Sequence, residues 1–349
     1  MPSPRLPRLP RRATLIVARA LVLASLLAAS QAAAQSKTGT TIGQFLLIEP
    51  SARFTAIGNT GVSAQPDLDA VYYNPAIGAG LEHLEFQFSH VDWFAGIRYD
   101  YVASVLPFGK WGNVFADVTS LGSGDMDVRT VSQPLGTGEK FAVTNIALGL
   151  GYAYQVTDRF AGGIQARWLQ ETIWHSSAST VTFDVGAIYR ITEDGLHIGS
   201  SITNFGTSAR YSGRDLEITY DNDPTRQGDN GALPGERSTS DYPVPVMFRV
   251  GVGYPYRLSP EWRAWTALSA VHPSDNSESV SGGVELRYRE MFAVRAGYQD
   301  LFKKDSEQGL AAGVGLRGKL STTTYRVDYA WADFGRLEGV HRITVGFAF

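Results

Sequence analysis

Hydrophobic and polar residues alternate with a period of two along most of the chain after residue 81. Alternation of this kind is typical of antiparallel strands, in which successive side chains point to opposite faces. We count fourteen such runs, and the last of them ends the chain. On this terminal strand one face would carry Arg342, Thr344, Gly346 and Ala348, and the other would carry Ile343, Val345, Phe347 and Phe349.

Two kinds of β protein fit this pattern, a soluble sandwich that buries its apolar face and a membrane barrel that turns this face to lipid. The charged residues share a face with glycine and alanine, and in a closed barrel that face lines the lumen. Several apolar faces end in Tyr or Trp, as expected at a membrane boundary. The sequence therefore favours a barrel, with these charges facing the lumen: Arg98, Asp100, Arg167, Asp184, Arg249, Glu285, Arg287, Arg295, Arg317, Arg326, Asp328 and Arg342.

The connections between the predicted strands alternate in length. Most of those after even-numbered strands are tight, whereas residues 122–143 and 206–243 are long and polar. Outer-membrane barrels have short periplasmic turns and long external loops. Because hydrocarbon tolerates no unpaired strand edge, residues 340–349 are predicted to pair with residues 84–90. We predict an all-β transmembrane antiparallel barrel of about fourteen strands in the outer membrane of a Gram-negative-type bacterium, with the count uncertain by one hairpin.

The first 35 residues have a different character. Arg5, Arg8, Arg11 and Arg12 precede an apolar run over residues 20–29, and Ala32-Ala33-Ala34-Gln35 follows. This order predicts a secretory signal peptide. A retained helical anchor is the alternative, but Arg19 interrupts the run and the remainder is too short to span a bilayer.

Removing this leader takes away five of the 31 basic residues and none of the 34 acidic ones, which leaves 26 against 34, a charge of about -8. A mildly acidic exported chain is a poor binder of nucleic acid. The chain has no cysteine, so it forms neither a disulfide nor a lipidated N-terminus.

Residues 36–81 form one long stretch without strand periodicity. Small residues, glycines and a proline indicate short helices and turns. A flexible leader is the alternative, but the apolar content argues against free solvation. A barrel of about fourteen strands needs something in its lumen. We therefore predict a signal peptide at 1–35, an N-terminal hatch at 36–81 that plugs the lumen, and the transmembrane barrel at 82–349.

Several short motifs carry a family resemblance. They are Ser51-Ala52-Arg53, Ile57-Gly58, Asp69-Ala70, Tyr73-Asn74-Pro75-Ala76, His90-Val91-Asp92-Trp93, Tyr99-Asp100-Tyr101-Val102-Ala103, Thr157-Asp158-Arg159-Phe160, Phe183-Asp184-Val185-Gly186 and Thr203-Asn204-Phe205-Gly206. Through them the first half of the mature chain resembles the PorV/PorQ family, which is related to the FadL transporters of long-chain fatty acids. The resemblance implies a hatch motif made of Gly58, Asp69, Asn74, Pro75 and Ala76.

The same resemblance implies a component or cargo-binding shuttle of a type IX-like protein secretion system. The two long loops would then contact secreted cargo and other secretion components. The alternative is a FadL-like channel for long-chain fatty acids or other hydrophobic solutes. In either case we expect outer-membrane lipid around the barrel, and the barrel-assembly machinery as a partner of the terminal strand.

The sequence gives little support for catalysis. The six histidines are scattered without metal-ligand spacing, and no GxSxG, HExxH or P-loop pattern occurs. His90, Asp92, His175 and Ser176 could meet at one rim, but loop residues of ordinary polarity are the simpler reading. Calcium binding at residues 122–125 is weakly indicated. We expect no enzyme activity, no resident metal and no cofactor.

Overall fold

The computed structural model describes residues 39–192, 195–221, 223, 225, 232–303 and 306–349. The predicted signal peptide and residues 36–38 lie outside the described residues. The described residues belong to one compact unit.

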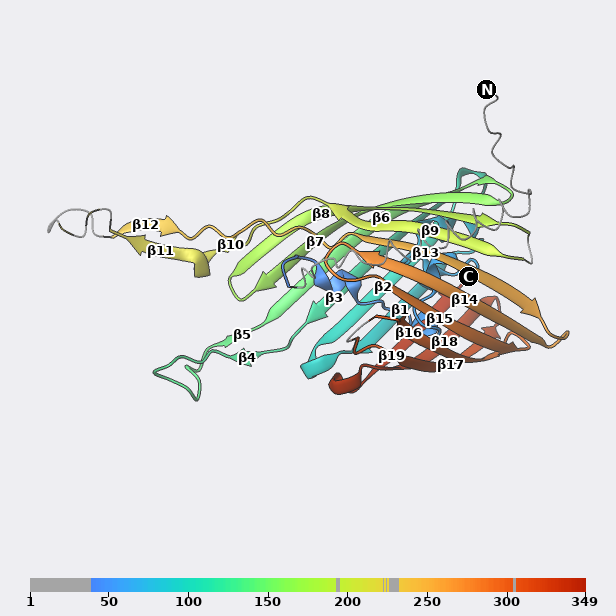
Figure 1. Cartoon of the computed structure of the whole chain (residues 1–349). Coiled ribbons are helices and arrows are strands. Elements are labelled where there is room, and N and C mark those ends of the chain that lie inside the picture. Colours follow the sequence, from blue (N-terminus) through green and yellow to red (C-terminus); the bar gives the residue numbers. More distant parts are fainter. Residues whose placement is uncertain (1–38, 193–194, 222, 224, 226–231, 304–305) are drawn as a thin grey trace, which may run out of the picture. The chain divides into compact units, whose positions relative to one another are not determined.

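The unit is a closed antiparallel barrel of fourteen strands, which confirms the predicted fold. Each strand pairs with its neighbours in the barrel, and pairing of β8 with β9 and of β1 with β19 closes it (Figure 1). The strands are β1 (Glu85–Asp92), β2 (Arg98–Pro107), β3 (Asn113–Gly122), β6 (Val143–Thr157), β7 (Phe160–Ile173), β8 (Ser176–Arg190), β9 (His197–Gly206), β13 (Met247–Arg257), β14 (Trp262–Pro273), β15 (Ser279–Tyr288), β16 (Phe292–Leu301), β17 (Leu310–Leu320), β18 (Thr323–Asp333) and β19 (Gly339–Ala348).

The terminal strand closes the barrel as predicted. β19 runs antiparallel to β1, with Phe347 opposite Phe86 and Arg342 opposite Val91. The backbone N–H of Phe349 donates to the carbonyl of Leu84 at 3.0 Å. No free edge is therefore left at this seam, as burial in hydrocarbon requires.

Loop lengths differ between the two ends of the barrel. The turns between β6 and β7 and between β17 and β18 have two residues each, whereas the connections from β3 to β6 and from β9 to β13 are long. Two small hairpins lie in these long connections and extend beyond the same end of the barrel (Figure 1). We call the two ends the short-turn end and the long-loop end. The hairpins are β4 (Met126–Asp127) with β5 (Lys140–Phe141) and β11 (Glu217–Tyr220) with β12 (Leu233–Glu236), and β10 (Ser212–Gly213) pairs antiparallel with the start of β8.

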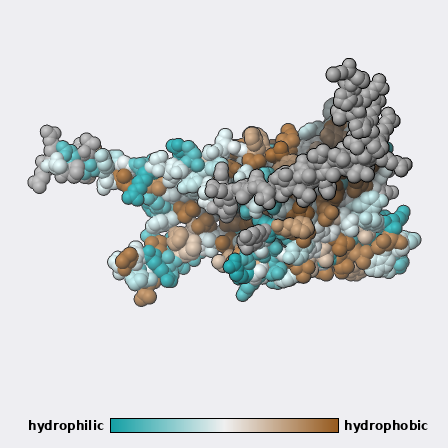
Figure 2. Space-filling view, viewed as in Figure 1, coloured by the Kyte–Doolittle hydropathy of each residue, from teal (hydrophilic) through white to brown (hydrophobic). Residues whose placement is uncertain are grey.

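Alternate residues of most strands face opposite sides of the wall. On the outer side Phe88, Leu150 and Ile343 are exposed, while on the inner side Arg342 and Thr344 are buried. Hydrophobic residues accordingly cover much of the barrel surface that is visible in Figure 2, whereas hydrophilic and hydrophobic residues are mixed on the projecting loops. None of the helices among the described residues is long and apolar enough to cross a membrane.

The N-terminal segment, residues 39–81, lies inside the barrel. It contacts the wall on opposite sides, since α2 packs on β17 to β19, η3 on β9, β13 and β14, and η4 on β3 and β6 to β8. Nearly all its side chains are buried. Its elements are η2 (Gln44–Leu47), α2 (Ala52–Thr55), η3 (Gly61–Ser63), α3 (Leu68–Val71) and η4 (Pro75–Gly80); four further short helices lie in connections, at η5 (Phe94–Gly96), η6 (Gly109–Trp111), η7 (Arg214–Leu216) and η8 (Gly335–Leu337).

Candidate functional site

The candidate site is the contact between the N-terminal segment and the inner wall. Local sequence fixes two charged residues of the segment. The Ser51 side chain accepts a hydrogen bond from the backbone N–H of Phe54 and so caps α2, which carries Arg53. Asp67 caps α3 by accepting from the N–H of Asp69 at 3.0 Å. Both caps hold charged side chains in fixed positions facing the wall.

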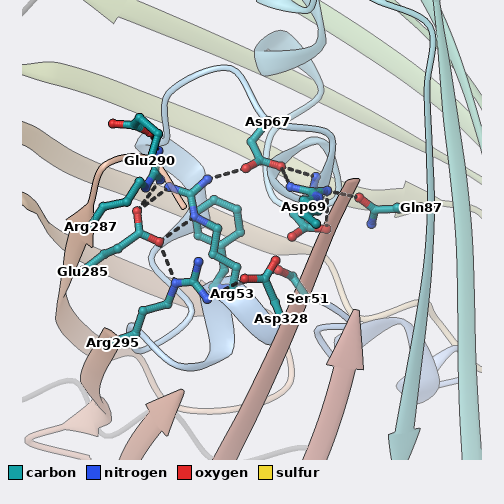
Figure 3. Close-up of polar contacts among 12 residues, drawn as sticks. Ser51, Arg53, Asp67, Asp69, Gln87, Glu285, Arg287, Glu290, Arg295 and Asp328 are labelled. Atoms are coloured by element: carbon teal, nitrogen blue, oxygen red, sulfur yellow. Dashed lines mark hydrogen bonds and ion pairs between the residues drawn. The ribbon is translucent and has the colours of Figure 1, made fainter. Parts of the chain in front are cut away.

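Arg53 joins the segment to β15. Its guanidinium donates twice to the Glu285 carboxylate, with both N–O distances at 2.9 Å, and also to the carboxylate of Asp67. Glu285 further accepts from Arg287 at 2.5 Å and from Arg295 at 2.6 Å (Figure 3). One buried carboxylate is thus shared by three guanidinium groups, which makes it the centre of the contact.

A second set of bonds joins the segment to β18. Arg326 donates to Asp67, forms an ion pair with Asp69 at 3.0 Å, and donates to Gln87 of β1 at 2.9 Å. Arg295 links to this strand by donating to Asp328 at 2.6 Å. We call these residues the lumen ion cluster: Arg53, Asp67, Asp69, Glu285, Arg287, Arg295, Arg326 and Asp328.

A glycine makes room for one of these ion pairs. Arg295 of β16 and Asp328 of β18 bridge across the intervening strand β17 at Gly315, which lies opposite Asp328. A Cβ added at Gly315 would lie 2.7 Å from the Arg295 guanidinium, so any other residue there would displace the pair.

Burial and charge set the ionisation of the two aspartates of α3 differently. Burial and the neighbouring Asp67 and Asp328 raise the pKa of Asp69 to about 7, against the opposing effect of Arg326. Burial also acts on Asp67, but Arg326 and Arg53 outweigh it and hold the pKa of that carboxyl well below its usual range. Neither carboxylate oxygen of Asp69 makes a hydrogen bond with a described residue.

Two smaller groups of charges hold other parts of the lumen. Arg167 of β7 donates to Asp184 at 3.0 Å, and its guanidinium lies over the ring of Tyr72 in the segment. Arg249 of β13 donates to Glu49 of the segment at 3.3 Å. Charged wall residues therefore meet the segment on several sides.

The Asn74-Pro75-Ala76 motif attaches the segment to β7 and β8 without charge. The side-chain amide of Asn74 donates to the carbonyls of Val62 at 2.8 Å and Ala187 at 3.0 Å, and its oxygen accepts from the N–H of Ala76. The motif lies directly on two paired glycines of the wall. A Cβ at Gly163 would lie 2.5 Å from the Ala76 nitrogen, and one at Gly186 would collide with the Asn74 amide oxygen.

The turn at Gly58 makes a similar close contact with β15 and β16. Gly58 has a φ of 75°, in the left-handed region that favours glycine. A Cβ there would lie 2.7 Å from the carbonyl oxygen of Gly282 and 2.8 Å from that of Tyr298. The wall is thin at this point, since Gly283 and Gly297 also face the segment without side chains.

The structure corrects the prediction for two of the charged residues. Arg98 is exposed and Asp100 half-exposed on the outer face of β2, next to the outward Val102, whereas Tyr99 and Tyr101 are buried inside. Asp100 pairs with the outward His90 at 2.6 Å near the long-loop end. The prediction that Arg98 and Asp100 face the lumen was therefore wrong. At the rim an ion pair with His90 stabilises the Asp100 carboxylate and solvent stabilises Arg98, so neither charge needs a partner in the lumen. The other ten predicted lumen charges lie on the inner face: Arg167, Asp184, Arg249, Glu285, Arg287, Arg295, Arg317, Arg326, Asp328 and Arg342.

Arg53, Asp67 and Glu49 were missed as partners of the wall. Their stretch has no periodicity, so the sequence does not show which wall residues they meet. The available signal was the pair of capping positions, Ser51 before Arg53 and Asp67 before Asp69, which mark helix starts in a segment expected to be buried.

The residues weighed for catalysis are engaged in separate contacts. His90 pairs with Asp100 on the outer surface. The Nδ1 atom of His175 lies 2.9 Å from a carboxylate oxygen of Asp215, which belongs to the connection between β9 and β13. Ser176 also contacts Asp215, at 3.4 Å. Within the described ranges, no group of three or more His, Asp or Glu side chains is placed to hold a metal ion.

Comparisons with known proteins place the fold. No family model matches the sequence, and no curated protein matches it. Among solved structures, the chain is similar to the toluene transporter TodX of Pseudomonas putida, with 12% identity, a TM-score of 0.53, and coverage of 86% of this chain and 98% of that one. The Ralstonia pickettii toluene transporter TbuX shares 14% identity with a TM-score of 0.51, over 86% and 97% of the two chains. The monoaromatic hydrocarbon channel CymD shares 12% with a TM-score of 0.53, over 86% and 97%.

These similarities show that the chain shares the barrel fold of these channels. The similar structures are transport channels rather than enzymes. They give no support specific to the PorV/PorQ family, and they agree better with the alternative reading of the sequence, a channel for hydrophobic compounds.

Proposed function

We propose that this protein is an outer-membrane channel for small hydrophobic solutes, in which residues 39–81 act as a hatch. The observation that carries the proposal is the placement of this segment inside the lumen, held by side-chain contacts that can be broken and remade. The toluene and hydrocarbon channels named above share the fold, and this supports hydrophobic compounds as the solute class.

The outer wall beside the thin part of the barrel supports a route into lipid. An apolar recess of about 310 Å³ on the outer surface is lined by Val252, Leu268, Gly282 and Leu301 among others. The Gly58 turn of the hatch lies against Gly282 on the inner side. Movement of this turn would place the lumen next to a surface that holds apolar solutes.

The test uses a lock on the hatch, which is simple because the chain has no native cysteine. A Cβ at Gly78 of η4 would lie 3.3 Å from the Cβ of Ala153 on β6, close to disulfide geometry. Cells that express the Gly78→Cys/Ala153→Cys variant in an outer membrane without other hydrocarbon channels are given labelled toluene. We expect uptake under reducing conditions and its loss on oxidation.

The Gly78→Cys and Ala153→Cys single variants are the controls, and their uptake should not depend on oxidation. Equal uptake by cells with and without the reduced protein would contradict the channel. Uptake that persists when the disulfide has formed completely would contradict the hatch.

A second candidate, a PorV/PorQ-like role in protein secretion, draws on one observation. Val131 and Leu135 are fully exposed at the tip of the β4–β5 hairpin, beyond the barrel. Binding residues are often found on loops that project from a rigid scaffold, and this placement favours the candidate. If this role holds, a tagged protein co-purifies a secreted protein or a secretion component from its host, and Val131→Asp/Leu135→Asp abolishes the capture. Failure of the unaltered protein to retain either would count against it.

A further inference from the structure

Arg317 on the inner face of β17 has an unusual position. It lies directly opposite Arg326 of β18 in the strand register. Like charges opposite each other on one face of a sheet repel and destabilise the pair. Arg326 pairs with Asp67 and Asp69, but Arg317 makes neither an ion pair nor a side-chain hydrogen bond with any residue that the structure describes.

The acids of the lumen ion cluster are already engaged, and so is Glu290, which pairs with Arg287 and Arg263. Asp67 is shared by Arg53 and Arg326, and Glu285 is shared by three arginines. Asp328 is bound to Arg295. The lumen ion cluster therefore offers Arg317 no carboxylate that is not in use.

Arg317 instead faces a cavity of about 230 Å³ at the short-turn end of the barrel. Arg326 and His83 line the polar side of this cavity with it, and Glu85 is the one carboxylate there that makes no ion pair with a described residue. Tyr325 and Phe347 line another side, and both belong to the outward faces of their strands. The cavity thus lies next to a half-buried cation and to two aromatic residues from the lipid-facing side of the wall.

We propose that this cavity is a binding site for an anionic amphiphile. The phosphate or carboxylate head would accept hydrogen bonds from the Arg317 guanidinium, and an acyl chain would lie along Phe347 and Tyr325. The anionic head would supply the negative charge that is needed to balance the two opposed arginines. This site is distinct from the proposed hydrocarbon route and does not depend on it.

The experiment measures binding of three probes that share a twelve-carbon chain: dodecyl phosphate, dodecanoate and dodecanol. The full mature protein in neutral maltoside micelles is titrated by calorimetry, with protein-free micelles as the blank. We expect both anions to bind at least about tenfold more tightly than the alcohol, the amount that one charge-assisted hydrogen bond supplies. Equal affinities for the three probes would overturn the proposal.

Arg317→Gln should lower the affinity for both anions about tenfold and leave dodecanol unchanged. Arg159→Gln is the matched control, since Arg159 is an exposed arginine in a turn at the same end, and it should change nothing. Glu85→Gln should raise anion affinity, because it removes the carboxylate that shares the cavity. Heat-modified gel mobility and the melting temperature show whether each variant is folded, and an anion preference that survives in folded Arg317→Gln would overturn the proposal.

A further probe separates the two sources of such an anion. Lysophosphatidylglycerol carries the phosphate of a membrane lipid, whereas dodecanoate is a free solute. Binding of the lipid alone assigns the site to a resident lipid of the membrane, and binding of dodecanoate alone assigns it to a solute. Binding of neither by the unaltered protein overturns the proposal, and toluene uptake by the same protein shows whether the channel function stands independently.

Discussion

On the β15–β18 side of the lumen the N-terminal segment meets the wall through charged side chains, whereas its residues 74–76 meet β7 and β8 through backbone and one amide. The charged contact, which we call the ionic attachment, consists of Arg53 and Asp67 with Glu285 and Arg326. The neutral contact, the glycine attachment, consists of residues 74–76 lying on Gly163 and Gly186. One depends on complementary charges, and the other on the absence of side chains.

This difference determines how each contact can fail. A buried ion pair contributes little net stability relative to an apolar pair, yet removal of one partner leaves an uncompensated charge and is costly. A close backbone contact fails when volume is added, because the two backbones cannot move apart without loss of hydrogen bonds. Changes of charge should therefore loosen one side, and changes of volume the other.

The largest effect is expected for Glu285→Gln. Loss of this carboxylate leaves Arg53, Arg287 and Arg295 without their shared partner inside the lumen. We expect the free energy of unfolding to fall by about 3–5 kcal/mol, measured by urea unfolding of the barrel in micelles. The control is Glu290→Gln, since Glu290 is half-exposed and pairs with Arg287 and Arg263 at the rim. Glu290→Gln should lower the free energy of unfolding by about 1 kcal/mol or less. Equal decreases in Glu285→Gln and Glu290→Gln would contradict the ionic attachment.

A smaller effect should appear as a pH dependence that belongs to the ionic attachment alone. The pKa of Asp69 is raised to about 7, above its ordinary value of 3.8, so the folded state keeps a proton that the unfolded state releases. Stability should therefore fall as the pH rises from about 4 to about 7, by about 2 kcal/mol between pH 5 and 7. The groups that face Asp69 are Arg326, Asp67, Asp328 and Arg53.

Asp69→Asn should flatten this dependence without a change at the acid end of the range. Asp67 does not obscure the result, because its pKa is lowered and its contribution is lost only on acidification below its ordinary value. A pH profile of unfolding that is the same in Asp69→Asn and the unaltered protein would show that Asp69 does not titrate in this window.

The glycine attachment is tested by two neighbouring glycines of β7. Gly163→Ala places a methyl group against the backbone of Pro75 and Ala76, which we expect to lower the free energy of unfolding by about 1–2 kcal/mol. Gly162→Ala adds the same group on the outer side, where the nearest atom is 4.0 Å away. It should change stability by about 0.5 kcal/mol or less, and a similar loss in both variants would contradict the close contact.

Sequence alone predicted the strands of the barrel wall better than the contacts that residues 39–81 make with it. The alternation on β15 to β19 identified Glu285, Arg295 and Arg326 as inward, and the terminal strand was paired correctly with β1. The partners of these charges were not predictable. Arg53 and Glu285 are separated by 232 residues, and no periodicity in residues 39–81 indicates which wall residue each segment residue meets.

Strand β2 shows where the charge rule itself fails. Alternation divides its residues into two faces, but which face is inward was inferred from charge. Tyr101 is buried against Tyr72 of the segment with ring centroids 5.4 Å apart, so an aromatic face fills the lumen there. Arg98 and Asp100 lie outward near the long-loop end, where the membrane no longer excludes charge. The rule holds for the middle of a strand and not for its rim.

Asp100→Asn gives the smallest expected effect and tests this assignment. Asp100 pairs with His90 on the outer surface, and exposed pairs contribute about 0–1 kcal/mol. Asp184→Asn is the inward counterpart: Asp184 is buried, pairs with Arg167 at 3.0 Å and accepts from the backbone N–H of Asn204 at 2.7 Å. Urea unfolding should show a loss of about 3 kcal/mol or more for Asp184→Asn and less than about 1 kcal/mol for Asp100→Asn. A large loss of stability in Asp100→Asn would instead indicate that Asp100 faces the lumen. It would then contradict the assignment of Tyr99 and Tyr101 to the inner face of β2.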